Sequence, residues 1–538
     1  MVTYNFAIVY PLPLSPLIIS SIDTFIDVKT LNGTYKASTL SKVLVEVRKL
    51  EPYEIIIVDN GSTDGTKEIA LQHNCRVIYY RYSLGNDVGR AIGAREAKGE
   101  IVLFLDGDIV MKSEELYNFI KGIQQGHEIV LNNLTWSVYL KMRPHYTTVG
   151  KYMLNRYLNK KEFVVGSLIA IPHAISREVI EELGWWNLAD PALFQAMAMS
   201  RGVDISDMAS VDVIYTNKVR PVHTGTSPGS PYPKATSRIM GDHLRALQYV
   251  IETYGNRGGF SEGNKDREFV GKYKPVLLQK KKAKYSAIIP VSEEKTTIRS
   301  VIQEVKKAGV DEIIVVVNGA AVKTIKQVKL ENVIVVELEE VLGHNVARAI
   351  GAMYATADIC LFVDSDFVIP ATNLILFLRA IEDGSDVALN DLQCLLDMFH
   401  PADPISMGKY FVNLIAKRPD LWNNSLTAVP HAMHKKVIEK IGYDSLVIPP
   451  LAQVKAILEG FSITAVELVD VIKTNRVRPE QHEFVNGRIS AFDRIFGDQI
   501  EAIAYLLQCT DERGGFTDGD RDRDIIQQLR REEENTNE

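Results

Sequence analysis

The sequence predicts an α/β protein made of two tandem copies of one domain, each with a mainly parallel β-sheet. The first observation is that short apolar runs rich in β-branched residues alternate with helical segments, an order typical of parallel sheets with crossover helices. The second is internal repetition: the segment from Leu84 to Ala94 is answered by the segment from Leu342 to Ala352, 258 residues later. We therefore expect an internal duplication.

The same offset continues through both halves. It relates Asp106 to Asp364, Gly150-Lys151-Tyr152 to Gly408-Lys409-Tyr410, Pro172-His173-Ala174 to Pro430-His431-Ala432, and Thr216-Asn217 to Thr474-Asn475. It falls to 256 for Arg257-Gly258-Gly259-Phe260 against Arg513-Gly514-Gly515-Phe516. We expect a first domain at residues 1–272, a linker at 273–284, a second domain at 285–528 and a polar tail at 529–538.

Composition narrows the class of protein. A chain of 538 residues with 46% hydrophobic and 24% charged residues is typical of a soluble globular protein with several domains. Its net charge of −7 argues against non-specific binding to nucleic acid, which needs a basic surface. The four cysteines form no Cys-x-x-Cys pair, which argues against a zinc ribbon and a disulfide framework and favours the reducing cytoplasm.

We expect no membrane-spanning helix, because no stretch reaches the roughly 18 apolar residues that such a helix requires. Contact with a membrane would therefore be peripheral. The basic run Lys280-Lys281-Lys282 lies between the two halves, and we interpret it as part of a solvated linker rather than as a lipid-binding site.

In the first half, strands and helices alternate up to the first acidic motif. The expected strands are Phe6 to Tyr10, Glu54 to Val58, Val77 to Tyr80 and the run that ends at Asp106. One helix is expected after the N-cap candidates Ser62, Thr63 and Asp64, and another from Val88 to Ala97.

Beyond Asp108 the pattern is less regular. We expect strands at Ile129 to Leu131, Phe163 to Ile171 and Val211 to Tyr215, and a helix from Pro191 to Ser200. The loop from Thr224 to Pro233 is rich in Gly, Pro, Ser and Thr, and is either a mobile lid or a plain surface connection. The second half begins with a strand from Tyr285 to Ile289.

The clearest chemical signal is Asp106-Gly107-Asp108 at the end of an apolar strand. Two carboxylates at this position suit a hard divalent ion such as Mg²⁺ or Mn²⁺, and open α/β sheets bind ligands at the carboxyl ends of their strands. Asp-Gly-Asp is also ordinary turn chemistry. The recurrence of the pattern at Asp364-Ser365-Asp366 favours the metal site.

Three motifs in order resemble the nucleotide-sugar-dependent glycosyltransferases of GT-A fold, especially family 2. They are Ile56 to Thr66, Gly85 to Gly93 and the Asp-x-Asp strand end, and the resemblance covers both halves. It implies a Rossmann-like sheet that binds a UDP- or GDP-linked sugar with Mn²⁺ or Mg²⁺. A divalent ion held by carboxylates stabilises the charge of the leaving diphosphate.

The resemblance implies roles for four residues of the first half. Asp108 is expected to bind the metal, with Asp106 as a second ligand or as a contact to the donor ribose. Asp59 and Arg90 are expected to contact the donor. Two structural alternatives stay open: Asp59 caps the turn at Gly61, or Arg90 is a solvated helix residue.

Two further site residues follow from the resemblance. Asp190 lies where family 2 enzymes often carry a Glu-Asp pair whose Asp deprotonates the acceptor, although the first acid is Ala189 here and Asp190 is also placed to cap the next helix. His223 resembles the late metal-binding His of many GT-A enzymes. Asp190 favours inversion of the anomeric carbon, whereas the segment from Arg220 to His223 also resembles retaining glucosyl-phosphoglycerate and mannosylglycerate synthases.

The second half carries a changed set of candidates. It keeps Arg348, Asp364 and Asp366, and His482 lies one place past the register of His223. Three acids have become aliphatic, because Val317, Val322 and Ile448 stand where the first half has Asp59, Asp64 and Asp190. Since the loss of a base or ribose ligand is costly in an enzyme, we expect a catalytic first domain and a second that is degenerate or takes another donor or acceptor.

The leading functional prediction is metal-dependent sugar transfer to a hydroxyl of a carbohydrate, a lipid-linked molecule or a protein. One alternative is a bifunctional glycan polymerase with two active sites. Another is a nucleotidyltransferase or a non-catalytic nucleotide-sugar-binding scaffold, although the segment from Tyr10 to Leu14 lacks the Gly-rich basic loop of nucleotidyltransferases. Trp185 and Trp186 are candidate sugar-stacking platforms, with core packing as the simpler role. A homo-oligomer is compatible with the sequence.

Overall fold

The structure is a computed structural model. It describes residues 22–29, 37–216, 225–226, 230–276, 282–291, 297–319, 322–343, 345–471, 484–485 and 488–537. The strand expected at Phe6 to Tyr10 and the two metal-ligand candidates His223 and His482 lie outside the described residues.

Each half of the chain forms a seven-stranded sheet, and the two sheets have the same strand order. The first has the order β3-β2-β1-β4-β6-β5-β7, with β1 (Ile22–Lys29), β2 (Glu54–Asn60), β3 (Arg76–Tyr80), β4 (Ile101–Asp106), β5 (Ile129–Asn132), β6 (His173–Ser176) and β7 (Ile205–Ala209). The second has the order β10-β9-β8-β11-β13-β12-β14, with β8 (Tyr285–Val291), β9 (Glu312–Asn318), β10 (Ile334–Leu338), β11 (Ile359–Phe362), β12 (Val387–Asn390), β13 (His431–His434) and β14 (Ile463–Glu467).

Within these two sheets, neighbouring strands run parallel except at β6 and β13, which are antiparallel to both of their neighbours. A short hairpin pairs β15 (Phe484–Val485) with β16 (Arg488–Ile489). The predicted α/β fold with two mainly parallel sheets is confirmed.

Helices cover both faces of each sheet. In the first half they are α1 (Ala37–Arg48), α2 (Thr66–Gln72), α3 (Val88–Glu96), α4 (Ser113–Gln124), α5 (Tyr146–Tyr157), α6 (Arg177–Leu183), α7 (Pro191–Arg201), α9 (Lys234–Tyr254) and α10 (Arg267–Lys272), with 3-10 turns η1 (Thr135–Tyr139), η2 (Lys161–Phe163) and η3 (Trp185–Ala189). In the second half they are α11 (Ile298–Lys307), α12 (Val322–Lys329), α13 (Val346–Tyr354), α14 (Ala371–Glu382), α15 (Leu395–Met398), α16 (Pro404–Ile415), α17 (Lys435–Ile441), α18 (Pro449–Leu458), α20 (Ser490–Cys509) and α21 (Arg523–Asn537), with η4 (Pro419–Leu421) and η5 (Tyr443–Val447). Among the described helices, none combines the length and the apolar character needed to cross a membrane.

Two expected strands are wrong, and side-chain hydrogen bonds explain why. The segment from Phe163 to Ile171 forms turns, because Asn155 donates to the carbonyl of Gly166 at 3.0 Å and Gln195 accepts from the amide of Leu168 at 3.0 Å. These amides therefore satisfy backbone groups that a strand would pair in a ladder.

The segment from Val211 to Tyr215 also lies outside the sheet, whose edge strand is β7. The side chain of Asp212 accepts from the amides of Ile214 and Tyr215 and so holds a turn there. A smaller error concerns α2, which begins at Thr66 with Gly65 at its N-cap rather than at residues 62–64.

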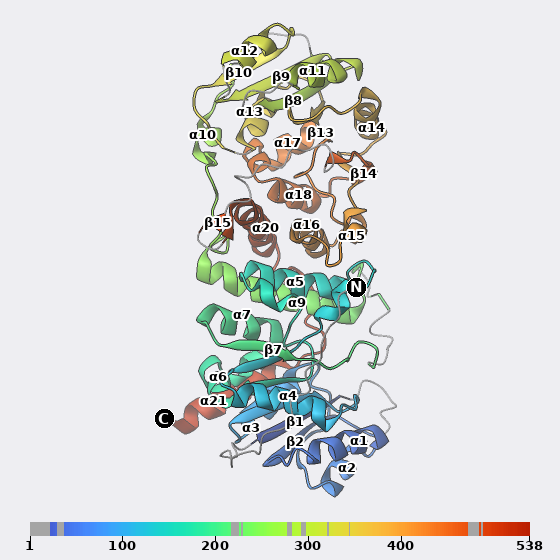
Figure 1. Cartoon of the computed structure of the whole chain (residues 1–538), viewed down its shortest axis with the longest axis vertical. Coiled ribbons are helices and arrows are strands. Elements are labelled where there is room, and N and C mark those ends of the chain that lie inside the picture. Colours follow the sequence, from blue (N-terminus) through green and yellow to red (C-terminus); the bar gives the residue numbers. More distant parts are fainter. Residues whose placement is uncertain are drawn as a thin grey trace, which may run out of the picture.

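The two halves share a helical core between their sheets. Helices α5 and α9 of the first half pack against α16 and α20 of the second, and the two sheets lie at opposite ends of the elongated molecule (Figure 1). One apolar cluster contains side chains from both halves, among them Tyr152, Leu247, Phe411 and Ile503. The duplicated units are thus joined by a buried interface rather than only by a linker.

The last helix of each copy lies on the other copy. Val270 of α10 belongs to the core around the second sheet, where α10 packs on α13 and η5. Ile526 of α21 belongs to a core of the first sheet, and Figure 1 shows the red α21 beside α6 and α3. We call residues 257–273 and 513–537 the exchanged segments. The domain boundaries expected at 272, 285 and 529 stay predictions. In the structure, each exchanged segment packs on the copy to which it does not belong in sequence.

Candidate functional site

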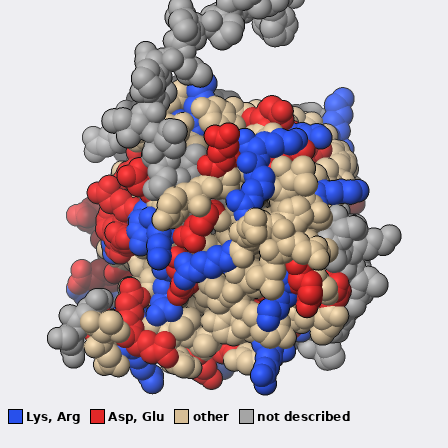
Figure 2. Space-filling model, turned by 90° about the horizontal axis from the view of Figure 1, so that it is seen from below, with Lys and Arg blue, Asp and Glu red and all other residues tan. Residues whose placement is uncertain are grey.

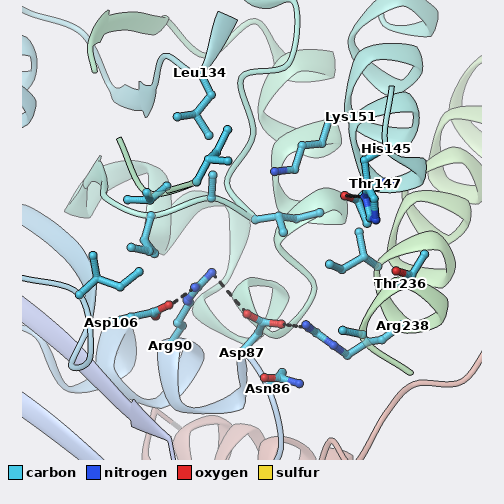
Figure 3. A pocket seen from close by; sticks show the side chains of 18 of the residues that line it. Asn86, Asp87, Arg90, Asp106, Leu134, His145, Thr147, Lys151, Thr236 and Arg238 are labelled. Atoms are coloured by element: carbon cyan, nitrogen blue, oxygen red, sulfur yellow. Dashed lines mark hydrogen bonds and ion pairs between the residues drawn. The ribbon is translucent and has the colours of Figure 1, made fainter. Parts of the chain in front are cut away.

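A cavity of about 420 Å³ opens at the carboxyl ends of the strands of the first sheet. Asp106 is the last residue of β4, and Asp108 follows it in the next turn; both line the cavity. Arg90 of α3 reaches it from one side, and Lys151 of α5 and Arg238 of α9 reach it from the other (Figure 3). The structure therefore brings together three of the predicted site residues: Arg90, Asp106 and Asp108.

The apolar strand positions the acidic pair. Residues 101–105 of β4 are buried, whereas the side chain of Asp106 is 28% exposed and faces the cavity. The chain turns directly after it, and Asp108 is 9% exposed. Two carboxylates with access to one cavity form an oxygen donor set that fits a hard divalent cation such as Mn²⁺ or Mg²⁺.

Arg90 is buried and bridges two acids. Its guanidinium lies 3.3 Å from Asp106 Oδ1 and 3.3 Å from Asp87 Oδ1, and it donates to the carbonyl of Leu168 at 3.4 Å. The interpretation of Arg90 as a solvated helix residue is wrong, because only 4% of the residue is exposed. Its charge is fixed at the edge of the cavity.

Asp59 lies at the end of β2, two strands from Asp106, and does not line this cavity. Its Oδ1 accepts from the amide of Ser62 at 2.9 Å, so the capping role at the turn is present. Its Oδ2 is buried and has no hydrogen-bond partner among the described residues. An unpaired buried carboxylate oxygen is costly, so Asp59 retains a free acceptor beside the turn.

Burial keeps three histidines neutral. His173 stacks on Phe104, and burial followed by the nearby Arg90 lowers its pKa to about 3. Burial likewise lowers the pKa of its counterpart His431 to about 3 and that of His243 in α9 to about 4. These imidazoles therefore act near neutral pH as uncharged packing and hydrogen-bonding groups.

Asp190, the predicted general base, lies outside the cavity in a buried cluster of arginines. Only 2% of the residue is exposed. Arg523 donates to it at 2.5 and 2.7 Å, and Arg521, Arg245 and Arg513 lie at 3.5 to 3.7 Å. In this arrangement its carboxylate neutralises arginines of the exchanged segment, and the role of general base stays a prediction.

Arg521 links the exchanged segment to the cavity. Its buried guanidinium donates to Asp242 at 2.6 and 2.8 Å and to Asp87 at 2.8 Å. Asp87 in turn pairs with Arg238 at 2.6 Å and with Arg90, which pairs with Asp106. A continuous chain of opposite charges therefore runs from the second copy's last segment to the acidic motif of the first.

Asp190 and Asp242 lie close to a third carboxylate, Asp518 of the exchanged segment, and the three together resemble a second metal site. Arg521 and Arg523 donate to all three, and Arg513 donates to Asp242 at 2.9 Å. Because guanidinium groups already supply the compensating charge, this cluster does not fit a divalent cation.

The second copy contains the mirror arrangement. Lys265 of the first exchanged segment pairs with Asp498 of α20 at 2.5 Å, as Arg521 pairs with Asp242. Arg267 pairs with Glu501 at 2.6 Å. Glu501 stands at the offset of 256 from Arg245, and Ile448 stands for Asp190. In the first copy Arg523 pairs with Asp190, which precedes a helix, whereas in the second copy its counterpart Arg267 pairs with Glu501 on α20. The second copy therefore needs no acid at position 448, where it has Ile448.

The sequence contains a signal for this cluster, of which the predicted site residues include only Asp190. The offset of 256 that matches Arg257 to Arg513 also matches Asp242 to Asp498 and Arg267 to Arg523. It runs with few breaks through both exchanged segments. What the offset did not reveal is that each segment crosses to the other copy.

Gly85 has two reasons to be glycine. Its φ is +81°, and a Cβ there would collide with the carbonyl of Asp520 in the exchanged segment. Beside it, the amide of Asp522 donates to the carbonyl of Leu84 at 2.8 Å. Gly343 has a φ of +85° and lies in the same way against Asn264. The repeated Leu-Gly motif is therefore the docking point of both exchanged segments.

Both predicted tryptophan platforms also contact the exchanged segment. Trp185 donates to Glu533 at 2.6 Å, and the guanidinium of Arg530 lies 4.5 Å from the ring centre of Trp186. Since these contacts attach α21 to η3, the packing role of the two indoles is the one observed.

The corresponding site of the second copy is smaller. Arg348 pairs with Asp364 at 2.6 Å, and both line a cavity of about 90 Å³ together with Asp366. Val317, which replaces Asp59, is buried. The acidic pair and the arginine are thus retained at the carboxyl ends of the strands, but in a much narrower space.

Charged residues of both signs are interspersed on the end of the molecule formed by the first sheet (Figure 2). This pattern agrees with a surface that is solvated rather than specialised for one sign of charge.

Comparison with known proteins gives one family. The family model described as glycosyl transferase family 2 matches residues 28–184 and 286–419, which together are more than half of the chain and include both Asp-x-Asp motifs.

Among curated proteins, a glycosyltransferase of Haloferax volcanii, AglE, is 38% identical over 74 residues, which are 13% of this chain and 24% of the relative. The cholesterol galactosyltransferase of Borreliella burgdorferi is 30% identical over 156 residues, 24% of this chain and 43% of the relative. An undecaprenyl-phosphate 4-deoxy-4-formamido-L-arabinose transferase of Photorhabdus laumondii is 28% identical over 98 residues, 17% of this chain and 30% of the relative. The chain therefore spans less than half the length of these relatives.

Among solved structures, glucosyl-3-phosphoglycerate synthase of Mycobacterium tuberculosis, in complex with Mn²⁺, UDP and phosphoglyceric acid, is 19% identical. The match covers 44% of this chain and 80% of that protein, with a TM-score of 0.32.

Proposed function

The chain belongs to glycosyl transferase family 2, and on this premise we propose that its first half transfers a sugar from a nucleotide-sugar donor to an acceptor hydroxyl. The observation that carries the proposal is the cavity of about 420 Å³ in which Asp106, Asp108 and the buried Arg90 meet. Such a site can bind a diphosphate and its cation at the carboxyl ends of parallel strands.

Asp108 and Asp106 would hold a divalent ion, Mn²⁺ or Mg²⁺, which supplies positive charge to the diphosphate as it leaves. Arg90 keeps Asp106 oriented at the cavity edge through its ion pair. The free Oδ2 of Asp59 would accept a hydrogen bond from the base or ribose of a UDP- or GDP-linked donor. His223 stays a prediction as a further metal ligand.

We propose that Asp190 positions the exchanged segment rather than acting as the general base. Its support is the full set of arginine partners and the compensating exchange of Asp190 and Arg245 for Ile448 and Glu501. The prediction of inversion at the anomeric carbon rested on Asp190 as the base, so this proposal removes its support. The anomeric configuration of the product would decide between inversion and retention.

We propose that the second half is a structural unit that completes the first. The narrow cavity, the buried Val317 and the exchanged segment that reaches Asp87 support this role. A polymerase with two active sites requires donor binding at Asp364 and Asp366. Calorimetric titration of the full chain with the donor separates the two, because one bound donor supports a single site and two support a polymerase.

The acceptor and the setting stay predictions. A carbohydrate, a lipid-linked molecule or a protein would each offer the required hydroxyl, and the names of two relatives refer to cholesterol and to undecaprenyl phosphate. A cytoplasmic location with peripheral membrane contact and a homo-oligomeric state are likewise predictions.

One experiment tests the proposed function. A panel of UDP- and GDP-sugars is incubated with the full chain and Mn²⁺ or Mg²⁺, and hydrolysis of the donor is measured. We expect one donor to react, with a rate that falls about 100-fold or more in Asp108→Ala because charge stabilisation is lost. Asp366→Ala, the matched change in the second copy, serves as control and should keep the wild-type rate. Equal rates in wild type and Asp108→Ala would contradict the proposal.

A further inference from the structure

The wall of the cavity that faces the acidic pair carries a lysine to which the described residues supply no ion-pair partner. Lys151 reaches from α5 toward the middle of the cavity, with His145 and Thr147 beside it and Asp106 on the far side (Figure 3). Among the described residues, no carboxylate lies within ion-pair distance of its ammonium group. The other two cations of the lining are paired, since Arg90 contacts Asp106 and Asp87, and Arg238 contacts Asp87.

Lys151 is half-buried in the cavity wall, and its partial removal from water makes the charge expensive. Desolvation alone lowers the pKa of Lys151 to about 8, so the group is still mostly protonated at pH 7. A desolvated ammonium group without a counter-ion is costly, and groups of this kind are typical of ligand-binding sites.

In the second copy, the lysine at the equivalent position has a carboxylate nearby, so the fold itself does not require a lysine without one. Lys409 is the counterpart of Lys151, and its pKa is likewise lowered by burial, but the carboxylate of Asp403 lies near enough to oppose that shift. Asp403 corresponds to His145, and each caps the helix that carries the lysine. In the first copy the carboxylate has thus been replaced by a neutral imidazole.

The neighbours of Lys151 are hydrogen-bond donors. Nδ1 of His145 accepts from the amide of Thr147 at 3.3 Å and lies 2.9 Å from its hydroxyl, so a neutral His145 carries its proton on Nε2. Thr236 adds a hydroxyl to the same wall. A cation with neutral donors around it is suited to an anion.

Building on the proposed function, we propose that Lys151, with His145 and Thr236, binds an anionic group of the acceptor, a carboxylate or a phosphate. The subsite lies across the cavity from the acidic pair, so an acceptor bound there has its hydroxyl directed toward the donor. The acceptor class is therefore a small hydroxylated acid or phosphate ester, or the phosphate head of a lipid.

Calorimetric titration of the full chain tests this subsite without turnover. The probes are inorganic phosphate and acetate, each added alone and in the presence of Mg²⁺ and the nucleoside diphosphate of the reacting donor. We expect one of the two anions to bind, and to bind also when the nucleotide is present. Which anion binds distinguishes a phosphate from a carboxylate acceptor.

Variants assign the binding to the lysine. Lys151→Met should weaken anion binding at least tenfold, Lys151→Arg should retain it within about threefold, and the matched control Lys409→Met should leave it unchanged. Displacement of the anion by the nucleotide would assign Lys151 to the donor and overturn the proposal, as would wild-type binding in Lys151→Met or no binding of either anion. Donor hydrolysis measured on the same preparation shows separately whether the proposed function holds.

Discussion

Replacement of Asp190 by Asn separates a structural role from a catalytic one. Asn has the shape of Asp but no charge, so Arg523 loses the negative charge and one of the two oxygens that it contacts at 2.5 and 2.7 Å, and Arg521 loses a nearby counter-charge. Breaking a buried ion pair costs about 3–5 kcal/mol. Because Arg523 keeps Asp518 as a second partner, we expect the lower end, about 3 kcal/mol.

That loss should fall on the exchanged segment and not on the whole chain, because Arg523 lies in α21 and this cluster adds to the packing of α21 on α3 and on the core of the first sheet. Hydrogen exchange of the α21 amides measures its local opening. A destabilisation of about 3 kcal/mol corresponds to exchange that is faster by about two orders of magnitude. Donor hydrolysis measured in parallel should change much less than this.

The second copy supplies a rescue variant. Asp190→Ile combined with Arg245→Glu reproduces the arrangement of Ile448 and Glu501. The α21 amides should therefore regain most of their protection from hydrogen exchange in the double variant, but not in the single variant Asp190→Ile. If Asp190→Asn instead lost activity by about a thousandfold with unchanged protection of α21, Asp190 would be a catalytic base and the structural explanation would be wrong.

Three further predictions concern the exchanged segment and the buried histidines. A chain that ends at residue 510 should lose donor hydrolysis and recover part of it when a peptide of residues 511–537 is added; full activity of the short chain would refute a role for that segment in the site. Gly85→Ala should release α21, measured by hydrogen exchange, whereas the control Gly126→Ala, with a φ of +104° and no atom within 4 Å, should not. Stability to urea should fall as the pH drops from 6.5 toward 4, because His173, His243 and His431 have lowered pKa values and take up protons only on unfolding, at about 1.4 kcal/mol per histidine and pH unit. His243→Gln, which copies Gln499 of the second half, should reduce that slope, and an unchanged slope would contradict it.

The parts of the fold that could be predicted are those in which local pattern and burial agree. The strand from Ile101 to Asp106 is apolar along its length and ends in an acid, so both its place in the sheet and its exposed last residue follow from the sequence. The helix from Val88 was found in the same way. The cavity residues Arg90, Asp106 and Asp108 could be predicted to lie together, because the two acids follow the strand that ends at Asp106 and Arg90 lies on the helix that precedes it.

The parts that failed depend on contacts that are distant in sequence. The strand expected at Phe163 to Ile171 is replaced by turns because amides of Asn155 and Gln195 satisfy its backbone, which no periodicity reveals. The arginine contacts of Asp190 were missed for the same reason, since its partner Arg523 lies 333 residues away. Charge pairs at that separation become visible only when the repeat is followed to its end and the chain path is known.

The exchange of terminal segments also has a consequence for biosynthesis. The first unit's cluster needs Arg521 and Arg523, which leave the ribosome only after the whole second unit has been made. At about 5–20 residues per second, this delay is on the order of tens of seconds. During that time Asp87, Asp190 and Asp242 have only the arginines of their own half, Arg90, Arg238 and Arg245, as counter-charges. A chain released before these residues would lack their ion pairs, so that completion of the first unit's cluster reports that synthesis has passed the second unit.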